Sequence, residues 1–415
     1  MNPDEIKRLI EQIYREKEIE KESVFRAIEE ALLTAASRHG NGPEHSNYEI
    51  SIDRQTCEIY VSRDNVPITT AEITERAGAQ SVRQSITQTI REAVRDKIYD
   101  KYTARVGELV LATVHKVERM GVLVYIDDNQ EAWLPNANKI RGEVYRSDSK
   151  YDMIIENVEK VGARARVILS RKSKLLVRRL FERECPEISN GSVEIVEISR
   201  DPGSRSKVAV RAVDSRLDPV GACLGPRNTR YFSVSNALNR EKIDIVIWSE
   251  STSEFIQNAL SPAKVDEVIL CAKLDRAIVL VQPDQRALAI GKRGQNVNLA
   301  KKLLGGWELE ILTHSNEDGS DELVKLLDKA SENFKKIDGM THEYAEALVS
   351  EGFTSFYDLS CIDPGEFAEM TGATMEETAA ILERAEELAL LEEEEREKER
   401  QQVAQIREQR VRDDR

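Results

Sequence analysis

Two glycines three positions apart enclose two basic residues in the stretch IGKRGQNVNLAKKL, residues 290–303. Glycine has no Cβ, so a backbone with this spacing can approach a phosphate closely. The first amides of a following helix point toward the same place, where the helix dipole favours an anion. We therefore predict a phosphate-gripping loop, the alternative being a basic turn between a strand and a helix. The candidate contact residues are Gly291, Lys292, Arg293, Gly294, Gln295 and Asn296.

A second copy of this loop lies 66 residues earlier, where Gly225 matches Gly291. The earlier copy reads KVAVRAV, DPVGACLG, PRNTRYFSVSNAL and IDIVIW, and the later one reads AIVLVQ, ALAIG, KRGQNVNLAKKLLGG and WELEIL. Each predicts a strand, a short apolar helix, a tight loop, a helix and a strand, so the repeat indicates two copies of one domain. The candidate contacts of the first loop are Gly225, Pro226, Arg227, Asn228 and Arg230.

A G-x-x-G loop between two helices is typical of the KH domain, where it clamps about four nucleotides of a single strand. The loop differs from a nucleotide P-loop, which has a longer glycine spacing followed by Lys-Ser/Thr. In the first copy Asn228 replaces the second glycine. Asparagine tolerates positive φ, which would preserve the turn, but its side chain would crowd a phosphate. We therefore expect the second loop to contribute more to binding.

The charge of the chain is unevenly distributed. Its 75 acidic and 60 basic residues give a net charge of −15, which taken alone disfavours nucleic acid. Residues 316–395, however, hold 23 acidic and 5 basic residues, and the remainder holds 52 acidic and 55 basic residues. Clusters of seven, three and five Arg or Lys without any acid lie at 161–180, 221–240 and 285–302. Such clusters create the local field that attracts phosphates.

The loops require a scaffold, and hydrophobic periodicity predicts one. Residues 3–36 are predicted to be helical, first through Ile6, Leu9, Ile10, Ile13 and Tyr14 and then from Val24 onward. A hairpin follows at 48–62 and a long helix at 78–102. The region after Gly107 alternates with period two, and about five short strands in that space favour a small OB-fold barrel over a fragment of a β-sandwich. The barrel lacks the aromatic pair common on RNA-binding faces, because only Tyr125 and Trp133 are nearby, and Trp133 is equally suited to the core.

The predicted fold class is a multidomain α+β protein. Its predicted parts are an N-terminal α+β domain (1–105), an OB-fold β-barrel (106–175), two tandem type II KH domains (176–250 and 251–315), a small helical acidic repeat (325–390) and a charged tail (391–415) that is either disordered or a solvated helix. The five cysteines and five histidines are scattered singly, which indicates neither a disulfide framework nor a metal site. The sequence has no run of 18 apolar residues and no signal-like N-terminus, so we expect a cytoplasmic protein without membrane contact.

Several stretches resemble the NusA family of bacterial transcription termination/antitermination factors. They are LSRKSKLLVRRLFERECPEISNGSVEI (169–195), DPGSRSKVAV (201–210), DPVGACLG (218–225), EKIDIVIW (241–248), AIGKRGQNVNLAKKLLGGWELEI (289–311) and, more weakly, TQTIREAVRDKIYDKY (87–102). The resemblance covers roughly residues 1–390. In one departure from the family pattern, the segment between Val61 and Gly78 is shorter than expected.

The resemblance implies a monomeric transcription elongation factor that is not an enzyme and needs no cofactor. It implies an N-terminal domain that binds RNA polymerase near the RNA exit channel, and an S-one-type barrel and KH domains that hold nascent single-stranded RNA. The factor would prolong pausing, assist hairpin formation and intrinsic termination, and join other factors in antitermination complexes. The acidic repeat would contact the polymerase α-subunit and fold back onto the KH surface.

Two other functions are consistent with KH and OB modules. An RNA-processing enzyme is disfavoured, because no acidic cluster with metal-binding spacing and no histidine-centred constellation is found. A general or ribosome-associated RNA-binding protein would use the same modules without contacting polymerase. The N-terminal domain distinguishes this alternative, since only the family interpretation requires that domain to bind polymerase.

Overall fold

The computed structural model of the chain describes residues 7–8, 11, 22, 24–26, 28–30, 32–33, 48–63, 66–68, 79–127, 129–214, 216–313 and 322–413. The chain forms two compact units, one of residues 1–180 with 237–239 and one of residues 181–236 with 240–415. The first predicted helical run, through Ile6, Leu9, Ile10, Ile13 and Tyr14, lies outside the described residues. None of the helices in the described ranges combines the length and the apolar character that a membrane span requires.

The N-terminal part of the first unit contains a small antiparallel sheet of strands β1 (Tyr48–Ile52), β2 (Ile59–Arg63) and β3 (Val66–Ile68). The predicted hairpin is confirmed, with Ile50 opposite Val61. Apolar residues spaced four apart before the sheet pack against it, as a helical stripe requires. The buried cluster consists of Val24, Phe25, Ile28, Leu32, Ile52, Cys57 and Ile90.

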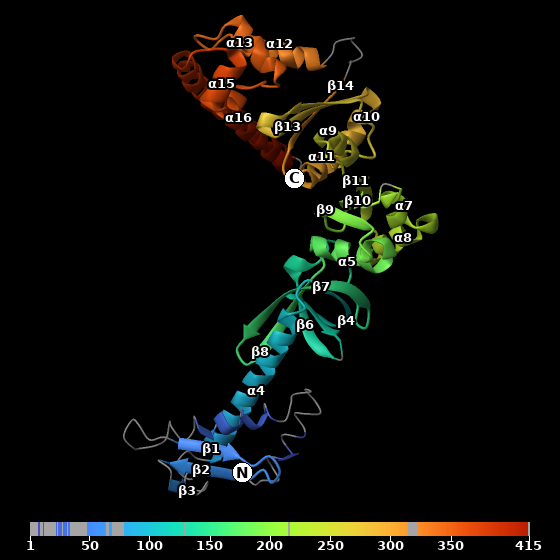
Figure 1. Cartoon of the computed structure of the whole chain (residues 1–415), viewed down its shortest axis with the longest axis vertical. Helices are drawn as coiled ribbons and strands as arrows, with labels where there is room; N and C mark the ends of the chain where they lie inside the picture. Colours follow the sequence, from blue (N-terminus) through green and yellow to red (C-terminus); the bar gives the residue numbers. More distant parts are fainter. Residues whose placement is uncertain are drawn as a thin grey trace. The chain divides into compact units, whose positions relative to one another are not determined.

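Helix α4 (Ala79–Thr103) runs from this sheet to the barrel (Figure 1). The last turns of α4 are part of the barrel core, because Tyr102 is 1% exposed and belongs to the same buried cluster as Val110 and Val124. The Tyr102 hydroxyl donates a hydrogen bond of 2.7 Å to Asp127, and burial raises the pKa of Tyr102. A division of the chain at residue 105 would therefore cut through this core.

Five strands close into a barrel in the order β4-β5-β6-β8-β7. They are β4 (Leu109–Glu118), β5 (Gly121–Ile126), β6 (Gln130–Pro135), β7 (Lys150–Val161) and β8 (Arg164–Ser170), with a short η1 (Asn136–Asn138) after β6. Val110, Ala112 and Val114 alternate inward along β4, as period-two patterning requires. The closed barrel was expected from the sequence, and its assignment to the OB-fold stays a prediction.

The second unit holds two domains with one shared topology, except that residues 174–180 and 237 of the first domain fall in the first unit. In each, three strands form a sheet whose first pair is antiparallel and whose second pair is parallel. The first domain comprises α5 (Lys174–Glu184), α6 (Pro186–Ser189), β9 (Val193–Asp201), β10 (Arg205–Ala212), α7 (Pro219–Leu224), η2 (Pro226–Asn228), α8 (Thr229–Ala237) and β11 (Lys242–Ile247). The second comprises α9 (Thr252–Ala259), β12 (Glu267–Cys271), η3 (Ala272–Leu274), β13 (Arg276–Val281), α10 (Pro283–Ile290), η4 (Lys292–Gly294), α11 (Gln295–Leu303) and β14 (Glu308–Thr313). The internal repeat predicted from the sequence is confirmed.

The two repeated domains share one hydrophobic core. Ala209 of β10 and Val246 of β11 are buried in the same cluster as Phe255 and Val279 of the second domain. A polar contact joins the same two domains, because the Lys207 ammonium donates a hydrogen bond of 2.6 Å to the carbonyl oxygen of Ser261. The two domains are therefore packed as one body.

Lys207 is fully buried, and it lies 3.2 Å from Asp244, which Arg205 also contacts at 2.7 Å. Burial lowers the pKa of Lys207 from 10.5 to about 8, against the opposing effect of Asp244. Between these two pH values the unfolded chain binds more protons at this position than the folded chain does. Stability contributed by this group therefore rises with pH in that window.

We expect the free energy of unfolding to rise by about 3 kcal/mol from pH 8 to pH 10.5 relative to a Lys207→Met variant, whose side chain cannot titrate. Urea denaturation of both proteins across this range measures the difference. Lys242→Met serves as the control, because Lys242 is exposed on the neighbouring strand β11. Parallel curves for wild type and Lys207→Met would contradict the assigned pKa.

The C-terminal part of the second unit is a small helical module. Its helices are α12 (Glu322–Phe334), α13 (His342–Ser350), α14 (Phe356–Ser360), α15 (Pro364–Thr371) and α16 (Met375–Asp413). The chain turns at Gly352 and Gly372, whose φ angles are 89° and 74°, as the predicted glycine turns require. Phe334, Phe353 and Phe367 are almost completely buried in the core of the module.

The helical module contacts the second KH domain through the β12–β13 turn. Arg276 donates hydrogen bonds to Asp358 at 2.9 Å and to Thr354 at 2.6 Å, and Gly352 lies directly against Cys271. Lys292 and Arg293 of the GKRG loop remain exposed. The contacts of these described residues leave the loop open, and masking of the loop by the acidic repeat stays a prediction.

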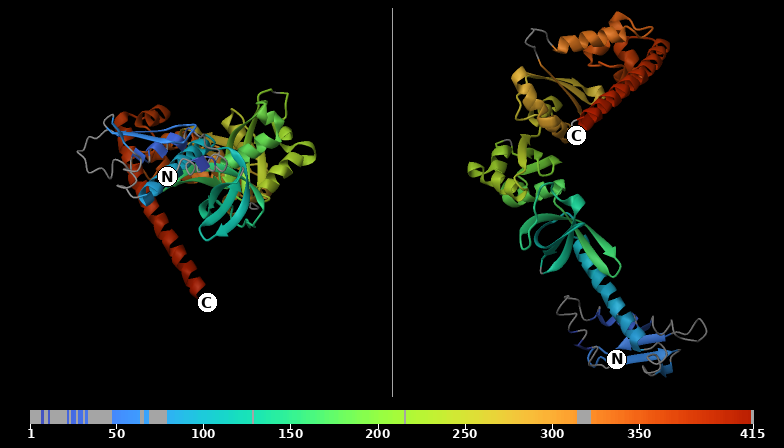
Figure 2. Two further views of the ribbon diagram at one scale, coloured as in Figure 1. Left: turned by 90° about the horizontal axis from the view of Figure 1, so that it is seen from below. Right: turned by 180° about the vertical axis from the view of Figure 1, so that it is seen from behind.

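Of the two alternatives for residues 391–415, a disordered tail and a solvated helix, the structure shows the helix for most of the segment, because α16 continues to Asp413 (Figure 2). The segment consists largely of Glu, Lys, Arg and Gln, which have high helix propensity. Pairs with helical spacing add to this tendency, as Glu394 and Lys398 show at 3.7 Å. Low apolar content alone therefore did not distinguish a solvated helix from a disordered tail.

Candidate nucleic-acid interface

The GKRG loop joins α10 to α11 through a backbone that requires glycine. Gly291 has φ 74° and ψ 172°, a region that only glycine adopts without strain, and Gly294 is left-handed. A Cβ on Gly291 would lie 2.8 Å from the backbone nitrogen of Asn296. Lys292 and Arg293 are exposed at the tip of the loop. The loop thus presents two cations and open backbone at the start of a helix, as expected for a phosphate-binding turn.

The backbone dihedral angles of the first loop are nearly the same as those of the GKRG loop. Gly225 has φ 69° and ψ 176°, and Arg227, with φ 52° and ψ 33°, matches Arg293, with φ 56° and ψ 32°. Asn228 takes the left-handed conformation of Gly294, with φ 60°. The expectation that asparagine preserves the turn is therefore confirmed. Arg227 and Asn228 are both exposed.

The sixth position of each loop faces inward. Arg230 donates to the carbonyl oxygen of Ala222 at 2.6 Å and to Glu187 at 2.7 Å, and its methylenes lie against Gly225. The Glu187 carboxyl has a pKa below its ordinary value, mainly because of a backbone hydrogen bond and secondarily because of Arg230. Arg230 thereby ties its loop to the preceding helix.

Asn296 occupies the same position in the second loop and is 1% exposed. Its side-chain NH₂ donates to the carbonyl oxygens of Leu260, Leu288 and Ala289 at 2.9, 3.1 and 3.1 Å. These carbonyls lie at or near the C-terminal ends of α9 and α10, where helices leave acceptors unsatisfied. The structure therefore places Asn296 beneath the loop as a support, although its residue type suggested a nucleic-acid contact.

Gln295 reaches across to the first KH domain. Its side-chain nitrogen donates to Asp201 and to the Ser204 hydroxyl, both at 2.6 Å. Asp201 ends β9, and Ser204 lies in the turn before β10. The turn is itself anchored, because Glu241 accepts a hydrogen bond of 2.8 Å from the Gly203 amide. The side-chain NH₂ group of Gln295 is therefore bound to a fixed turn of the first KH domain.

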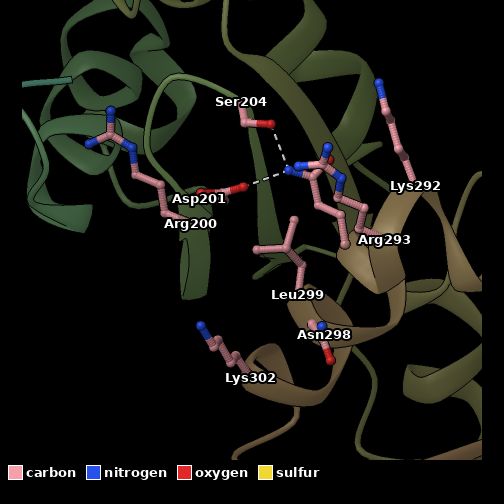
Figure 3. Close-up of a pocket in the computed structure, with 9 residues that line it drawn as sticks. Arg200, Asp201, Ser204, Lys292, Arg293, Asn298, Leu299 and Lys302 are labelled. Atoms are coloured by element: carbon pink, nitrogen blue, oxygen red, sulfur yellow. Dashed lines mark hydrogen bonds between the residues drawn. The ribbon is translucent and has the colours of Figure 1, made fainter. Parts of the chain in front are cut away.

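A cavity of about 510 Å³ lies between this turn and α11 (Figure 3). Arg200, Asp201 and Ser204 line it on the side of the first domain. On the side of the second domain it is lined by Lys292, Arg293, Gln295, Asn298, Leu299 and Lys302. Cations predominate in this lining. Arg200 is not presented to a ligand in the cavity, because its side chain is 2% exposed and its guanidinium is paired with the buried Glu241 at 2.9 Å.

The outer surface of the barrel carries aromatic side chains that were only partly expected. Trp133 is half-buried on the outer face of β6, with the Arg166 guanidinium 5.9 Å from its ring centre. The rings of His115 and Tyr125 lie 4.9 Å apart. This pair was not predicted from the sequence, and His115 lies at an irregularity in the β4–β5 register between Val114 and Lys116. That bulge has no sequence signature.

Several residues that line the cavity lie outside the two loops that the sequence motif identified. Asp201, Ser204, Asn298, Leu299 and Lys302 were not predicted as site residues. Among the described residues no group of three His, Cys, Asp or Glu side chains could hold a metal ion.

The repeated domains and their glycine-led loops define a tandem KH protein preceded by a β-barrel. Family models agree with this architecture along the chain: the NusA N-terminal domain matches residues 5–75, the NusA-like first KH domain matches 171–248, and the NusA-like second KH domain matches 252–318. The chain belongs to the NusA family.

Three relatives, each called transcription termination/antitermination protein NusA, illustrate the degree of similarity. The protein of Halalkalibacterium halodurans is 33% identical over 366 residues, which cover 81% of this chain and 94% of the relative. The Bacillus subtilis protein is 35% identical over 333 residues (73% and 89%), and the Thermus thermophilus protein is 38% identical over 278 residues (65% and 72%).

Proposed function

We propose that this chain acts in transcription termination and antitermination, the role printed in the names of its relatives. It holds nascent single-stranded RNA on its two KH loops while its N-terminal domain contacts RNA polymerase, and no catalytic step is needed. The observation that carries the proposal is the matched geometry of the two loops, each with exposed cations, on domains that share one core. Phosphates of one RNA strand can thus be bound at two fixed places.

The second loop makes the larger contribution to RNA binding in this proposal. It presents Lys292 and Arg293 with glycine on both sides, whereas Asn228 adds a side chain beside Arg227 in the first loop. Gly225, Pro226, Gly291 and Gly294 shape the loop backbones. Arg230 and Asn296 act indirectly by holding the loops in place.

The barrel offers a further surface for single-stranded RNA. Its exposed His115, beside Tyr125, and the half-buried Trp133, beside Arg166, provide rings and a cation on the outer face. Stacking of bases on aromatic side chains stabilises single-strand binding without strong sequence preference. An OB-fold barrel that adds such contacts would extend the RNA path beyond the KH domains.

The proposed partners are RNA polymerase, nascent RNA and other antitermination factors, and the protein acts as a cytoplasmic monomer. The polymerase contact is assigned to the N-terminal domain, because residues 5–75 match the NusA N-terminal domain. A deletion that tests this contact should end at residue 78, before α4, since the last turns of α4 are part of the barrel core.

The test is transcription through a hairpin pause with the cognate polymerase, combined with measurement of RNA binding. We expect Lys292→Ala/Arg293→Ala to weaken binding of single-stranded RNA and to lower the salt slope of log K by about 1.4, since two phosphate contacts are lost. The same variant should shorten the pause. Lys335→Ala/Lys336→Ala is the matched control, because both lysines are exposed on the helical module.

Removal of residues 1–78 should abolish the effect on pausing and leave RNA affinity unchanged. If RNA binding depends on Lys292 and Arg293 but pausing never responds to the protein, the chain is a KH-containing RNA binder without polymerase contact. RNA affinity equal to wild type in Lys292→Ala/Arg293→Ala would remove the KH loop from the proposal.

A further inference from the structure

The cavity between the β9–β10 turn and α11 has the chemistry of a nucleotide site rather than of a simple phosphate clamp. We propose that it reads one base of the bound RNA, preferring guanine over uracil, and that Asp201 and Gln295 determine this preference. The inference rests on the proposed function, because it requires that RNA pass the GKRG loop. It adds a residue of the first KH domain to the binding site of the second.

The hydrogen bonds of Gln295 fix the direction of its amide. A carboxylate can only accept hydrogen bonds, so Asp201 must face the NH₂ group of Gln295 rather than its carbonyl oxygen. The Ser204 hydroxyl oxygen takes the other bond from the same nitrogen. Both donors of the amide are thereby engaged by the protein. What Gln295 offers to a ligand is its carbonyl oxygen, a fixed acceptor.

Asp201 offers acceptors as well, because its side chain is exposed and its carboxylate has more lone pairs than the single bond from Gln295 uses. Two neighbouring acceptors match a base edge with two neighbouring donors. Guanine has such an edge in its N1–H and N2–H₂ groups. Uracil presents two carbonyl oxygens around one N–H, so it would place acceptors against acceptors.

The remainder of the cavity suits the other parts of a nucleotide. Leu299 lies between Lys292 and Lys302 in the cavity (Figure 3). Leu299 is only 3% exposed, so it forms an apolar floor of the cavity, and the cations at the two ends can neutralise the phosphates on either side of a base. A cavity of about 510 Å³ falls within the range of small-molecule pockets.

The two acceptors are held on a rigid support. Asp201 and Ser204 flank Gly203, whose amide is bound by Glu241, and Glu241 is itself buried against Arg200. On the other side, Gln295 begins α11, whose next residue, Asn296, is locked by three carbonyl oxygens. A preorganised pair of acceptors can discriminate between bases, because a mismatched base cannot push it aside.

The experiment measures binding of the full-length protein to oligoadenylate RNAs of one length, each with guanine, uracil or cytosine at one position, scanned along the strand. We expect one position at which guanine is bound about tenfold or more tightly than uracil. Asp201→Asn replaces an acceptor by a donor and removes a negative charge. This variant should lose the preference at that position while its overall RNA affinity stays equal or increases.

Asp284→Asn is the matched control, because Asp284 is exposed on α10 outside the cavity lining. It should retain the base preference, and thermal unfolding of both variants should match wild type. A wild-type protein that binds RNA through Lys292 and Arg293 without any position-specific preference would overturn the inference and leave the proposed function intact. A preference retained in Asp201→Asn would also overturn it. Failure of the wild-type protein to bind any of these RNAs would overturn both.

Discussion

Replacing Asn296 with aspartate is expected to lower the free energy of unfolding of the tandem KH unit by about 3–5 kcal/mol at neutral pH. The two side chains have the same shape, so packing is unchanged. The NH₂ group that donates to Leu260, Leu288 and Ala289 is, however, replaced by a carboxylate oxygen. A buried negative charge would then face three carbonyl oxygens without water. Chemical denaturation of the full-length protein measures the loss.

The pH dependence of this variant provides a second readout. Burial raises the pKa of a carboxyl, so the folded variant would hold its proton to higher pH than the unfolded chain, which ionises near 4. The stability penalty should therefore grow as the pH rises above about 4 and shrink as the pH is lowered. Asn298→Asp is the control, since Asn298 is exposed two residues later in the same helix. An equal loss in both variants would contradict the role assigned to Asn296.

Replacing Glu241 with glutamine is expected to lower the free energy of unfolding by about 3–5 kcal/mol, because it leaves the Arg200 guanidinium buried without the carboxylate that faces it. Glu241 is fully buried and accepts hydrogen bonds from Arg200, from the Gly203 amide and from the Ser206 hydroxyl. Glutamine would turn an NH₂ group toward some of these donors. The midpoint of urea denaturation gives the change.

The same substitution at Glu194 is the matched control. Glu194 pairs with Arg211 in the same sheet at 2.6 Å, but the two side chains are 51% and 44% exposed. Exposed ion pairs contribute roughly 0–1 kcal/mol, so Glu194→Gln should scarcely change the midpoint. Similar losses for the two variants would show that the burial of Glu241 is not what matters.

Sequence reasoning succeeded where a local pattern dictates a local conformation. The 66-residue repeat located both KH loops, because glycine at the first position is needed for a φ near +70° and a ψ near 175°. The left-handed conformation of Asn228 was also predictable, because asparagine tolerates a positive φ angle. The family resemblance added the expected roles of the domains, which the alternation of strands and helices alone left open.

It failed where the partner of a side chain is set by tertiary packing. Arg230 and Asn296 have the residue types of RNA contacts, yet both bind carbonyl oxygens of the preceding helix. Asp201 meets Gln295 across 94 residues of sequence, and only the packing of the two domains brings them together. The same limit applies to Tyr102, which lies in the long helix as predicted but whose side chain packs in the barrel core and not in the N-terminal domain.

The core shared by Ala209, Val246 and the residues of the second KH domain has a consequence for affinity. Two modest binding sites on a rigid frame act on one RNA strand with a high effective concentration, because the second contact forms within a complex already made. The gain depends on whether the strand can span the fixed distance between the loops. Inserting or removing nucleotides between the two contacted segments should thus change avidity without altering any individual contact. The affinity of the tandem domains for RNA then depends on the spacing of the contacted segments as well as on their composition.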